Sequence, residues 1–339
     1  MPETTYRNRR AVQTENQTAR LTVLVEGGHI AEIRHKASGM NPLWTPPWPS
    51  IEPSTWVAAR TPDYGNDAES RLLSGLMGHN VCIDLFGGPS PSEEAAGIPV
   101  HGEASVLPWE IAESGGEISC ACRMPMSGLQ FRRTLRLDGS RVLIGEIVEN
   151  LGAWDRPIAW QQHVTLGPPF LEHGKTRFEA TATASRTYEG DFGDLFESGV
   201  DFHWPAAPLK SGGEYDLRVF TEAGVSAGYT AHLMDRGSDD ASWRAWSPDG
   251  SVVFGYRWKR ADFPWLGIWE ENRSRRNPPW NGATIARGME FGVSPQPEPR
   301  RNMINRCSMF DTPAYRWIPA LGTVSVEYEA FIGEGEQRC

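Results

Sequence analysis

The sequence lacks the features that mark secreted, membrane-spanning and nucleic-acid-binding proteins. Residues 1–20 are polar and contain no apolar segment of the kind that a signal peptide requires. No run approaches the roughly 18–20 apolar residues that a membrane-spanning helix needs. Lys and Arg number 33 against 43 Asp and Glu, and the formal net charge of -10 disfavours contact with a phosphate backbone. We therefore expect a cytoplasmic protein with neither a membrane nor a nucleic acid as its partner.

Cysteine is also scarce. The odd count and the absence of a C-x-x-C pair argue against a disulfide framework and against a zinc site. We expect reduced thiols and no metal or other cofactor. The five cysteines are Cys82, Cys120, Cys122, Cys307 and Cys339.

Helical periodicity is rare, and only residues 69–77 could form a turn or two of helix. No Gly-rich loop lies between a strand and a helix, which excludes a Rossmann unit and a P-loop. There is no internal repeat at a fixed period and no low-complexity linker. The chain therefore belongs to none of the common nucleotide-binding or helical-repeat classes.

Alternation of apolar and polar residues with a period of two is frequent, and it predicts β-strands. The 35 Gly and 26 Pro supply the turns that many short strands need. We predict an all-β sandwich, with a polar N-terminal segment at residues 1–20 and a single domain at residues 21–335. The clearest strand candidates are residues 21–25, 128–137, 141–149, 215–220, 251–258 and 322–331.

Tryptophan is abundant, with 14 residues. Trp44, Trp48 and Trp56 lie in one Pro-rich segment, and Trp265, Trp269 and Trp280 lie in another. Loop-like segments cannot hide all of these rings in a core. Aromatic rings also stack on the apolar faces of sugars. We expect some of them to line a cleft.

Two histidines and one glutamate form a set suited to acid–base chemistry. His101 and His163 each follow a strand candidate beside Gly or Pro, which places them at strand ends. Glu290, in Gly288-Met-Glu-Phe-Gly292, could place a carboxylate on a sheet face. Opening a cyclic sugar needs a base for the anomeric hydroxyl and an acid for the ring oxygen, and His and Glu can fill both roles without a metal.

Glu270 and Glu271 are rivals to Glu290 as the base. They lie in the Arg-rich segment 270–276, so we expect them to form solvated ion pairs. Which of the three carboxylates faces a cleft stays open at this point.

Taken in order, these motifs resemble the galactose mutarotase-like (aldose 1-epimerase) superfamily, and most closely its uncharacterised bacterial branch. The resemblance extends over about residues 21–332. It implies a β-supersandwich of antiparallel strands with few short helices. The stretches that carry it are residues 78–88, 100–105, 148–163 and 263–290.

The resemblance also implies roles for individual residues. Glu290 would be the general base, His163 the general acid, and His101 would bind or polarise the same region. The substrate would be a small sugar or sugar derivative, and the reaction would interconvert its anomers. The implied substrate-binding residues are Asn80, Arg71, Gln161, Trp269 and Trp265.

Other functions fit the same residues. The fold could hold a sugar without converting it, as a non-catalytic binding module. A cupin-like enzyme could use His101, Glu103 and His163 as metal ligands. A polysaccharide-processing enzyme would need an open groove. The oligomeric state is not indicated by any of these patterns.

Overall fold

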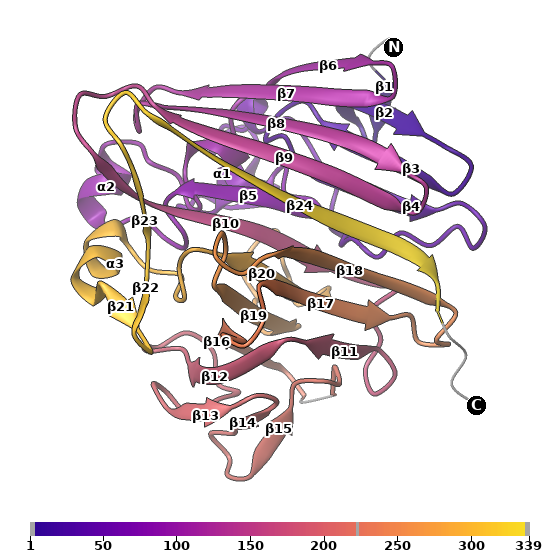
Figure 1. The fold of residues 1–339 in the computed structure, drawn as a ribbon, viewed down its shortest axis with the longest axis vertical. Coiled ribbons are helices and arrows are strands. Elements are labelled where there is room, and N and C mark those ends of the chain that lie inside the picture. Colours follow the sequence, from indigo (N-terminus) through magenta and orange to yellow (C-terminus); the bar gives the residue numbers. More distant parts are fainter. Residues whose placement is uncertain (1–3, 222–223, 336–339) are drawn as a thin grey trace.

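Two antiparallel sheets pack face to face in the computed structural model, which describes residues 4–221 and 224–335 (Figure 1). Strand residues far outnumber helical residues, and the predicted all-β class is confirmed. No described helix is both long and apolar enough to cross a membrane.

The larger sheet has twelve strands. In spatial order they are β1 (Thr4–Tyr6), β2 (Arg9–Glu15), β3 (Ala19–Leu24), β4 (Ile30–His35), β5 (His79–Asp84), β10 (Arg156–Leu166), β20 (Ile285–Gly292), β19 (Trp265–Asn272), β16 (Ser226–Met234), β12 (Ala182–Thr187) and β13 (Asp201–His203), with β23 (Arg316–Ile318) paired to β10.

The smaller sheet has eight strands, and two short hairpins and a few helical turns complete the fold. Its order is β11 (Arg177–Ala180), β17 (Asp240–Trp246), β18 (Val252–Lys259), β24 (Thr323–Glu334), β9 (Arg141–Asn150), β8 (Leu129–Asp138), β7 (Glu117–Met124) and β6 (Glu110–Ser114). The hairpins are β14 (Ala206–Pro208) with β15 (Glu214–Asp216), and β21 (Ser308–Met309) with β22 (Thr312–Pro313). The helices are α1 (Ser70–Leu73), α2 (Pro91–Ala95) and α3 (Arg300–Arg306), with 3-10 turns at Pro53–Thr55, Pro62–Tyr64 and Glu103–Ser105.

Most strand candidates from the sequence are present, with two differences. Of residues 215–220 only the first two are in a strand, at the end of β15. Residues 4–20, which we set apart as a polar segment, contribute β1, β2 and the start of β3 to the larger sheet. The polar residue Arg9 is fully buried there, where its guanidinium donates to Glu52 and to the carbonyls of Glu26 and Gly75.

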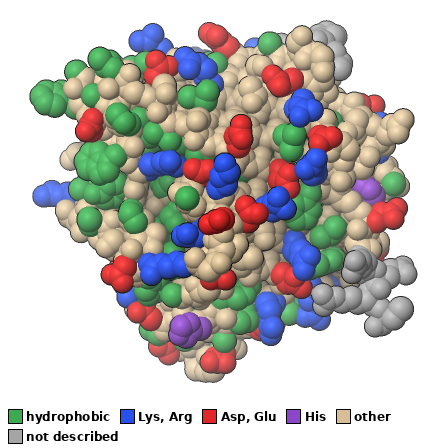
Figure 2. All heavy atoms as spheres, viewed as in Figure 1, with side chains coloured by type: hydrophobic (Ala, Val, Ile, Leu, Met, Phe, Trp, Pro, Cys, Tyr) green, Lys and Arg blue, Asp and Glu red, His purple; other side chains and the backbone are tan. Residues whose placement is uncertain are grey.

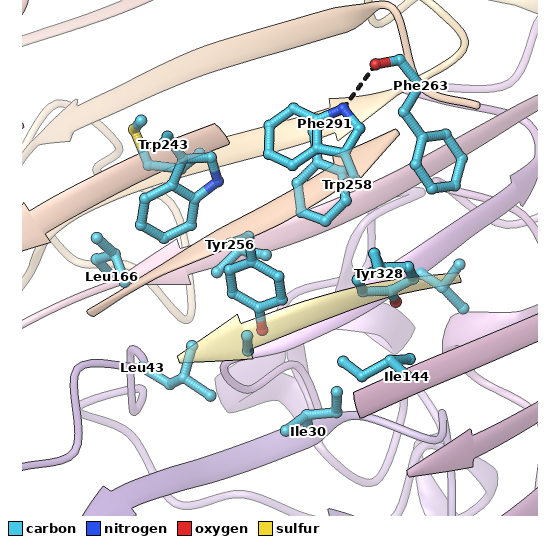
Figure 3. Close-up of a cluster of buried hydrophobic side chains, with 14 of the residues drawn as sticks. Ile30, Leu43, Ile144, Leu166, Trp243, Tyr256, Trp258, Phe263, Phe291 and Tyr328 are labelled. Atoms are coloured by element: carbon cyan, nitrogen blue, oxygen red, sulfur yellow. Dashed lines mark hydrogen bonds between the residues drawn. The ribbon is translucent and has the colours of Figure 1, made fainter. Parts of the chain in front are cut away.

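The main core lies between the two sheets and is rich in aromatic rings (Figure 3). Trp258 stacks on Phe291 with 4.2 Å between ring centroids, and its indole N–H donates to the carbonyl of Phe263 at 2.7 Å. The face shown in Figure 2 carries basic and acidic side chains interleaved, rather than a patch of one sign. That distribution agrees with the absence of a basic nucleic-acid footprint in the composition.

Strand β10 lies in the middle of the larger sheet, between β5 and β20. Trp160 and Val164 belong to the core between the sheets, whereas Gln161 and His163 occupy the alternate positions and face the opposite side. Loops cover that opposite side, so all but the first two residues of β10 are buried. A strand buried on both faces needs no alternation of apolar and polar residues.

Candidate active site

A row of side chains crosses the outer face of the larger sheet, the face turned away from the smaller sheet. His163 lies opposite Asn80 on β5 and opposite Glu290 on β20, and Glu290 lies opposite Gly267 on β19. The period of two sends these positions to one face. The register of the sheet therefore brings His163 and Glu290 together from strands that are far apart in sequence.

His163 and Glu290 are in contact. Nε2 of His163 lies 3.2 Å from Oε1 of Glu290. The two atoms are not aligned as a hydrogen bond, and Oε1 has no hydrogen-bond partner in the described part of the chain. The other ring nitrogen, Nδ1, lies 3.1 Å from Oγ1 of Thr165 and is held by it. The carboxylate oxygen is therefore available to a ligand.

Two glycines make room for this arrangement. A Cβ atom at Gly288, two residues before Glu290 on the same face, would collide with Oε1 of Glu290. A Cβ atom at Gly267 would collide with the hydroxyl of Tyr229. The Gly288-Met-Glu stretch therefore lets the carboxylate lie flat along its own strand.

His101 reaches the pair from a loop. It has φ +64°, and the following Gly102 has φ +79° in a place where a Cβ atom would strike the carbonyl oxygen of Ile83. Nδ1 of His101 accepts from the backbone N–H of Gly87 at 3.1 Å, so the neutral ring carries its proton on Nε2. The rings of His101 and His163 are 5.0 Å apart and meet edge to face.

A pocket of about 190 Å³ opens over these three side chains. Its aromatic wall consists of Phe86, Tyr188, Phe192, Tyr229, Trp269 and Trp280, and its aliphatic wall consists of Leu72, Leu73, Leu76 and Val100. The centroids of the Trp269 and His163 rings are 6.1 Å apart. Flat rings beside an acid–base pair are suited to holding the apolar face of a sugar.

Burial controls the protonation of all three polar groups. It raises the pKa of Glu290 well above the usual 4.5, because the carboxylate would lose its hydration. It lowers the pKa of His163 to about 4, and that of His101 well below the usual 6.5. Repulsion by the nearby Arg275 guanidinium lowers both histidine pKa values further. Both imidazoles are therefore neutral at pH 7, and Glu290 tends to hold a proton.

Arg275 and Glu69 form an ion pair in the pocket lining, with 2.7 Å between Nη1 and Oε2. Both are partly exposed, which places them at the solvent end. The guanidinium also lies over the rings of Trp280 and Trp269, at 4.9 and 5.5 Å from the centroids. These contacts fix Arg275 against the aromatic wall.

The structure brings four of the eight predicted site residues together: Glu290, His163, His101 and Trp269 line the pocket. Arg71 and Asn80 are not among the lining residues. The Arg71 guanidinium donates to the carbonyl of Pro53, and the Asn80 amide donates to Ser105. Asn80 is fully buried beside His163, and its Oδ1 has no partner among the described residues.

Gln161 and Trp265 share the outer face of the sheet but contact other groups. The Gln161 amide donates to the carbonyls of Glu290 and Ser294, so it supports the β20 backbone. The Trp265 indole donates to the carbonyl of Pro313 at 2.8 Å. Neither side chain lines the pocket.

Three expectations about placement are wrong. Glu270 and Glu271 are buried on β19 rather than solvated in a loop. Glu270 faces the smaller sheet and pairs with Arg287, whereas Glu271 accepts from Ser274. His163 lies within β10 rather than at a strand end, because strand pairing continues to Leu166.

The sequence did not identify most of the residues that form the pocket walls. Residues 69–77 were noted only as a possible helix, yet they supply Glu69 and the three leucines of the aliphatic wall. Tyr188, Phe192 and Tyr229 carried no motif. The one feature of the sequence that could have indicated a pocket role for Arg275 was its position in the Arg-rich segment that follows Trp269.

The three side chains of the alternative metal site, His101, Glu103 and His163, do not all come together. His101 and His163 lie together, but the Glu103 carboxylate accepts from the backbone N–H groups of Met126 and Ser127. Among the residues that the structure describes, no group of three or more His, Cys, Asp or Glu side chains is placed to hold a metal ion.

Several solved bacterial structures are similar to this one. A Klebsiella pneumoniae protein, provisionally named an aldose 1-epimerase, matches with a TM-score of 0.70 at 14% identity over 96% of this chain and 79% of that chain. A galactose mutarotase-like protein from Clostridium acetobutylicum matches with a TM-score of 0.63 at 12% identity over 98% of both chains. The chain has the galactose mutarotase-like fold. An Escherichia coli K12 protein, also provisionally named an aldose 1-epimerase, matches with a TM-score of 0.64 at 11% identity over 96% of this chain and 99% of that chain.

The likeness lies in structure alone. No protein-family model and no curated protein matches the sequence. A galactose mutarotase-like fold can host more than one function, so the function has to be argued from the pocket.

Proposed function

We propose that this galactose mutarotase-like protein interconverts the anomers of an aldose or sugar derivative by acid–base opening of the ring. The observation that carries the proposal is the Glu290–His163 contact at the floor of an aromatic pocket. The anomeric oxygen and the ring oxygen of a sugar are bonded to the same carbon. A base and an acid that serve them must therefore be neighbours, and 3.2 Å between the two side chains meets that requirement.

The reaction needs two coupled proton transfers. The Glu290 carboxylate takes the proton of the anomeric hydroxyl while the bond between the anomeric carbon and the ring oxygen breaks. The ring oxygen takes a proton from His163, and the anomeric carbon becomes an aldehyde. Rotation about the adjacent carbon–carbon bond and the reverse steps give the other anomer, with the protons returned.

The pair holds the one proton that this cycle needs. Burial raises the pKa of Glu290 and lowers that of His163, so the uncharged form with a carboxylic acid and a neutral imidazole dominates in the free pocket. Transfer of that proton to His163 creates the base and the acid together. A raised carboxyl pKa also makes Glu290 a stronger base near neutral pH.

Other residues take supporting roles in this proposal. His101 donates from Nε2 to an oxygen beside the reacting carbon, since its Nδ1 is occupied by Gly87. Trp269 stacks on the sugar, whereas Gln161 and Asn80 position the strands that carry the pair. We propose a cytoplasmic setting, which the free thiols of Cys82, Cys120, Cys122 and Cys307 support.

The proposal is tested by measuring the rate of anomer exchange in freshly dissolved sugars. Polarimetry or NMR exchange gives this rate for wild type and for Glu290→Gln. We expect wild type to speed equilibration of at least one sugar and the variant to lose that effect. Saturable sugar binding without acceleration on any sugar of a broad panel would contradict the reaction. It would leave a sugar-binding module of the same fold.

A further inference from the structure

The pocket offers few acceptors for the hydroxyl groups of a sugar, and the side chains of its aliphatic wall offer none. Glu290, His163 and His101 are at the floor, and Glu69 and Arg275 are at the solvent end. Between them lie the aromatic and aliphatic walls. A hydroxyl group pressed against such walls gives up its hydrogen bond to water without a replacement.

The polar atoms of the aromatic wall leave the aliphatic wall without a partner for a hydroxyl group. The hydroxyl of Tyr229 donates to the carbonyl of Pro295 at 3.0 Å, and that of Tyr188 to the carbonyl of Pro297 at 3.3 Å. Their protons are therefore engaged, but each hydroxyl oxygen can still accept a hydrogen bond, so these acceptors lie on the aromatic side of the pocket and the aliphatic side chains offer none. The indole N–H of Trp280 has no hydrogen-bond partner among the described residues, but it can only donate.

The one cationic side chain among the described residues that line the pocket is also engaged. Arg275 is paired with Glu69 at 2.7 Å and lies 3.7 Å from the Glu271 carboxylate. An anionic substituent on a sugar would have to displace Glu69. It would also be buried beside Glu290 in the same small cavity, where a charge without a partner loses its hydration.

We infer that the pocket takes a neutral reducing sugar with fewer free hydroxyl groups than a hexose, such as a deoxy sugar. The inference rests on the proposed function, because Glu290 and His163 hold the anomeric end and the walls meet the rest of the ring. Apolar positions of the sugar fill the aliphatic wall, where a hydroxyl group would lack an acceptor. Glu69 keeps Arg275 from acting as a site for carboxylate or phosphate groups.

Matched sugars test this inference. Each hexose is compared with its 2-deoxy and 6-deoxy counterparts of the same configuration, and with the corresponding uronate. Anomer exchange gives kcat/KM, and quenching of tryptophan fluorescence gives Kd independently of turnover. Trp269 and Trp280 line the pocket, so their emission should respond to a bound ring.

We expect at least one deoxy sugar to exceed its parent hexose by about 10-fold to 100-fold, because a buried hydroxyl group without a partner is penalised by that order. The uronate should bind more weakly than its neutral parent. Parent hexoses that equal or exceed every deoxy counterpart would overturn the inference while leaving the proposed function intact. If no sugar is turned over, the proposed function fails, and the order of Kd values alone decides the inference; a panel that causes no quenching overturns it too.

A single substitution tests the role of Glu69. Glu69→Gln should release Arg275 and strengthen binding of the uronate several-fold, with little change for the neutral sugar. Glu179→Gln is the matched control, since it removes the same charge from an ion pair with Arg244 away from the pocket. Equal uronate binding by Glu69→Gln and wild type would contradict the assignment.

Discussion

Two consecutive residues of β10 place their side chains in different buried polar environments, one on each face of the larger sheet. Gln162 faces the smaller sheet, and its amide donates to the Glu146 carboxylate at 2.6 Å. His163 faces the pocket and lies against Glu290. The first environment contains Glu146 and His79, whose Nε2 lies 2.9 Å from Oε1 of Gln162. The second contains Glu290 and His163. Of these two glutamates, only Glu146 has both carboxylate oxygens hydrogen-bonded.

The interior network shows what a satisfied buried glutamate looks like. Arg133, Tyr328 and Trp160 also donate to Glu146, at 2.8, 2.7 and 3.0 Å. Figure 3 shows Tyr328 and Tyr256 among the buried hydrophobic side chains of the core. The network bridges the two sheets, so we assign it to stability.

The pocket keeps polar atoms that the fold does not pair. Oε1 of Glu290 and the Trp280 indole N–H belong to lining residues and have no partners among the described residues. An unpaired buried polar group costs about 1–3 kcal/mol. Such atoms also occur outside the pocket, at His29 and Trp243 for example, so the pocket is distinguished by an unpaired Glu290 oxygen that lies beside His163 in an open cavity.

The largest expected effect is a loss of stability from a substitution in the polar network between the two sheets. Arg133→Met leaves Glu146 buried without its cation, and should lower the free energy of unfolding by about 3–5 kcal/mol. Urea denaturation followed by far-UV circular dichroism measures it. Arg275→Met is the pocket-side control, whose partly exposed ion pair should account for less than about 1 kcal/mol. Equal losses from the two substitutions would remove the distinction between the faces.

On the pocket side the expected effect is on rate. His163→Gln should slow anomer exchange by about 10²–10⁴-fold, the usual value of a general acid or base. Its free energy of unfolding should stay within about 1 kcal/mol of wild type, since His163 makes only one side-chain hydrogen bond within the described structure. His173→Gln, outside the pocket, serves as the control; a rate loss of the same size there would argue against a specific role for His163.

A smaller loss is expected from Gly288→Ala. The added methyl group collides with Oε1 of Glu290 and displaces the carboxylate, and a shift of about 1 Å can reduce a rate about 10²-fold. Gly333→Ala on β24 is the control, because a Cβ atom there meets nothing within 4 Å. Unchanged exchange kinetics in Gly288→Ala would show that the carboxylate position is not critical.

The smallest effect is a pH dependence of stability. The pKa of Glu290 is raised in the folded state, so folding favours the protonated carboxyl. That contribution is complete below the unfolded pKa near 4.5 and is lost as pH rises through the folded pKa. The stability of Glu290→Gln relative to wild type should therefore increase with pH above about 4.5, as denaturation at several pH values would show. A free energy of unfolding of Glu290→Gln that falls relative to that of wild type as pH rises would contradict the prediction.

The fold was largely predictable because strands on the smaller sheet follow a simple rule. Residues 128–137 and 141–149 alternate apolar and polar side chains, and they form β8 and β9 almost as expected. The two charged residues at inward positions, Arg133 and Glu146, pair with each other in the interior network. A strand with one buried face and one exposed face has a clear alternation of apolar and polar residues in its sequence.

The pocket was less predictable, since its strands are buried on both faces. In β10 and β19 alternation disappears, and Glu270 and Glu271 consequently seemed to belong to a loop. Glu290 and His163 were found through a family resemblance. The walls come from loops far apart in sequence, such as the one that carries Phe192, and only the tertiary structure brings them together.

The most direct test compares the two buried glutamates by one measurement, the free energy of unfolding of Glu146→Gln and Glu290→Gln. We predict that Glu146→Gln loses about 3–5 kcal/mol, because it leaves Arg133 buried without a counter-charge. Glu290→Gln should match or exceed wild type, because its carboxylate oxygen has no hydrogen bond to lose among the described residues. A loss in Glu290→Gln as large as that in Glu146→Gln would contradict the account, because the pocket glutamate would then serve stability.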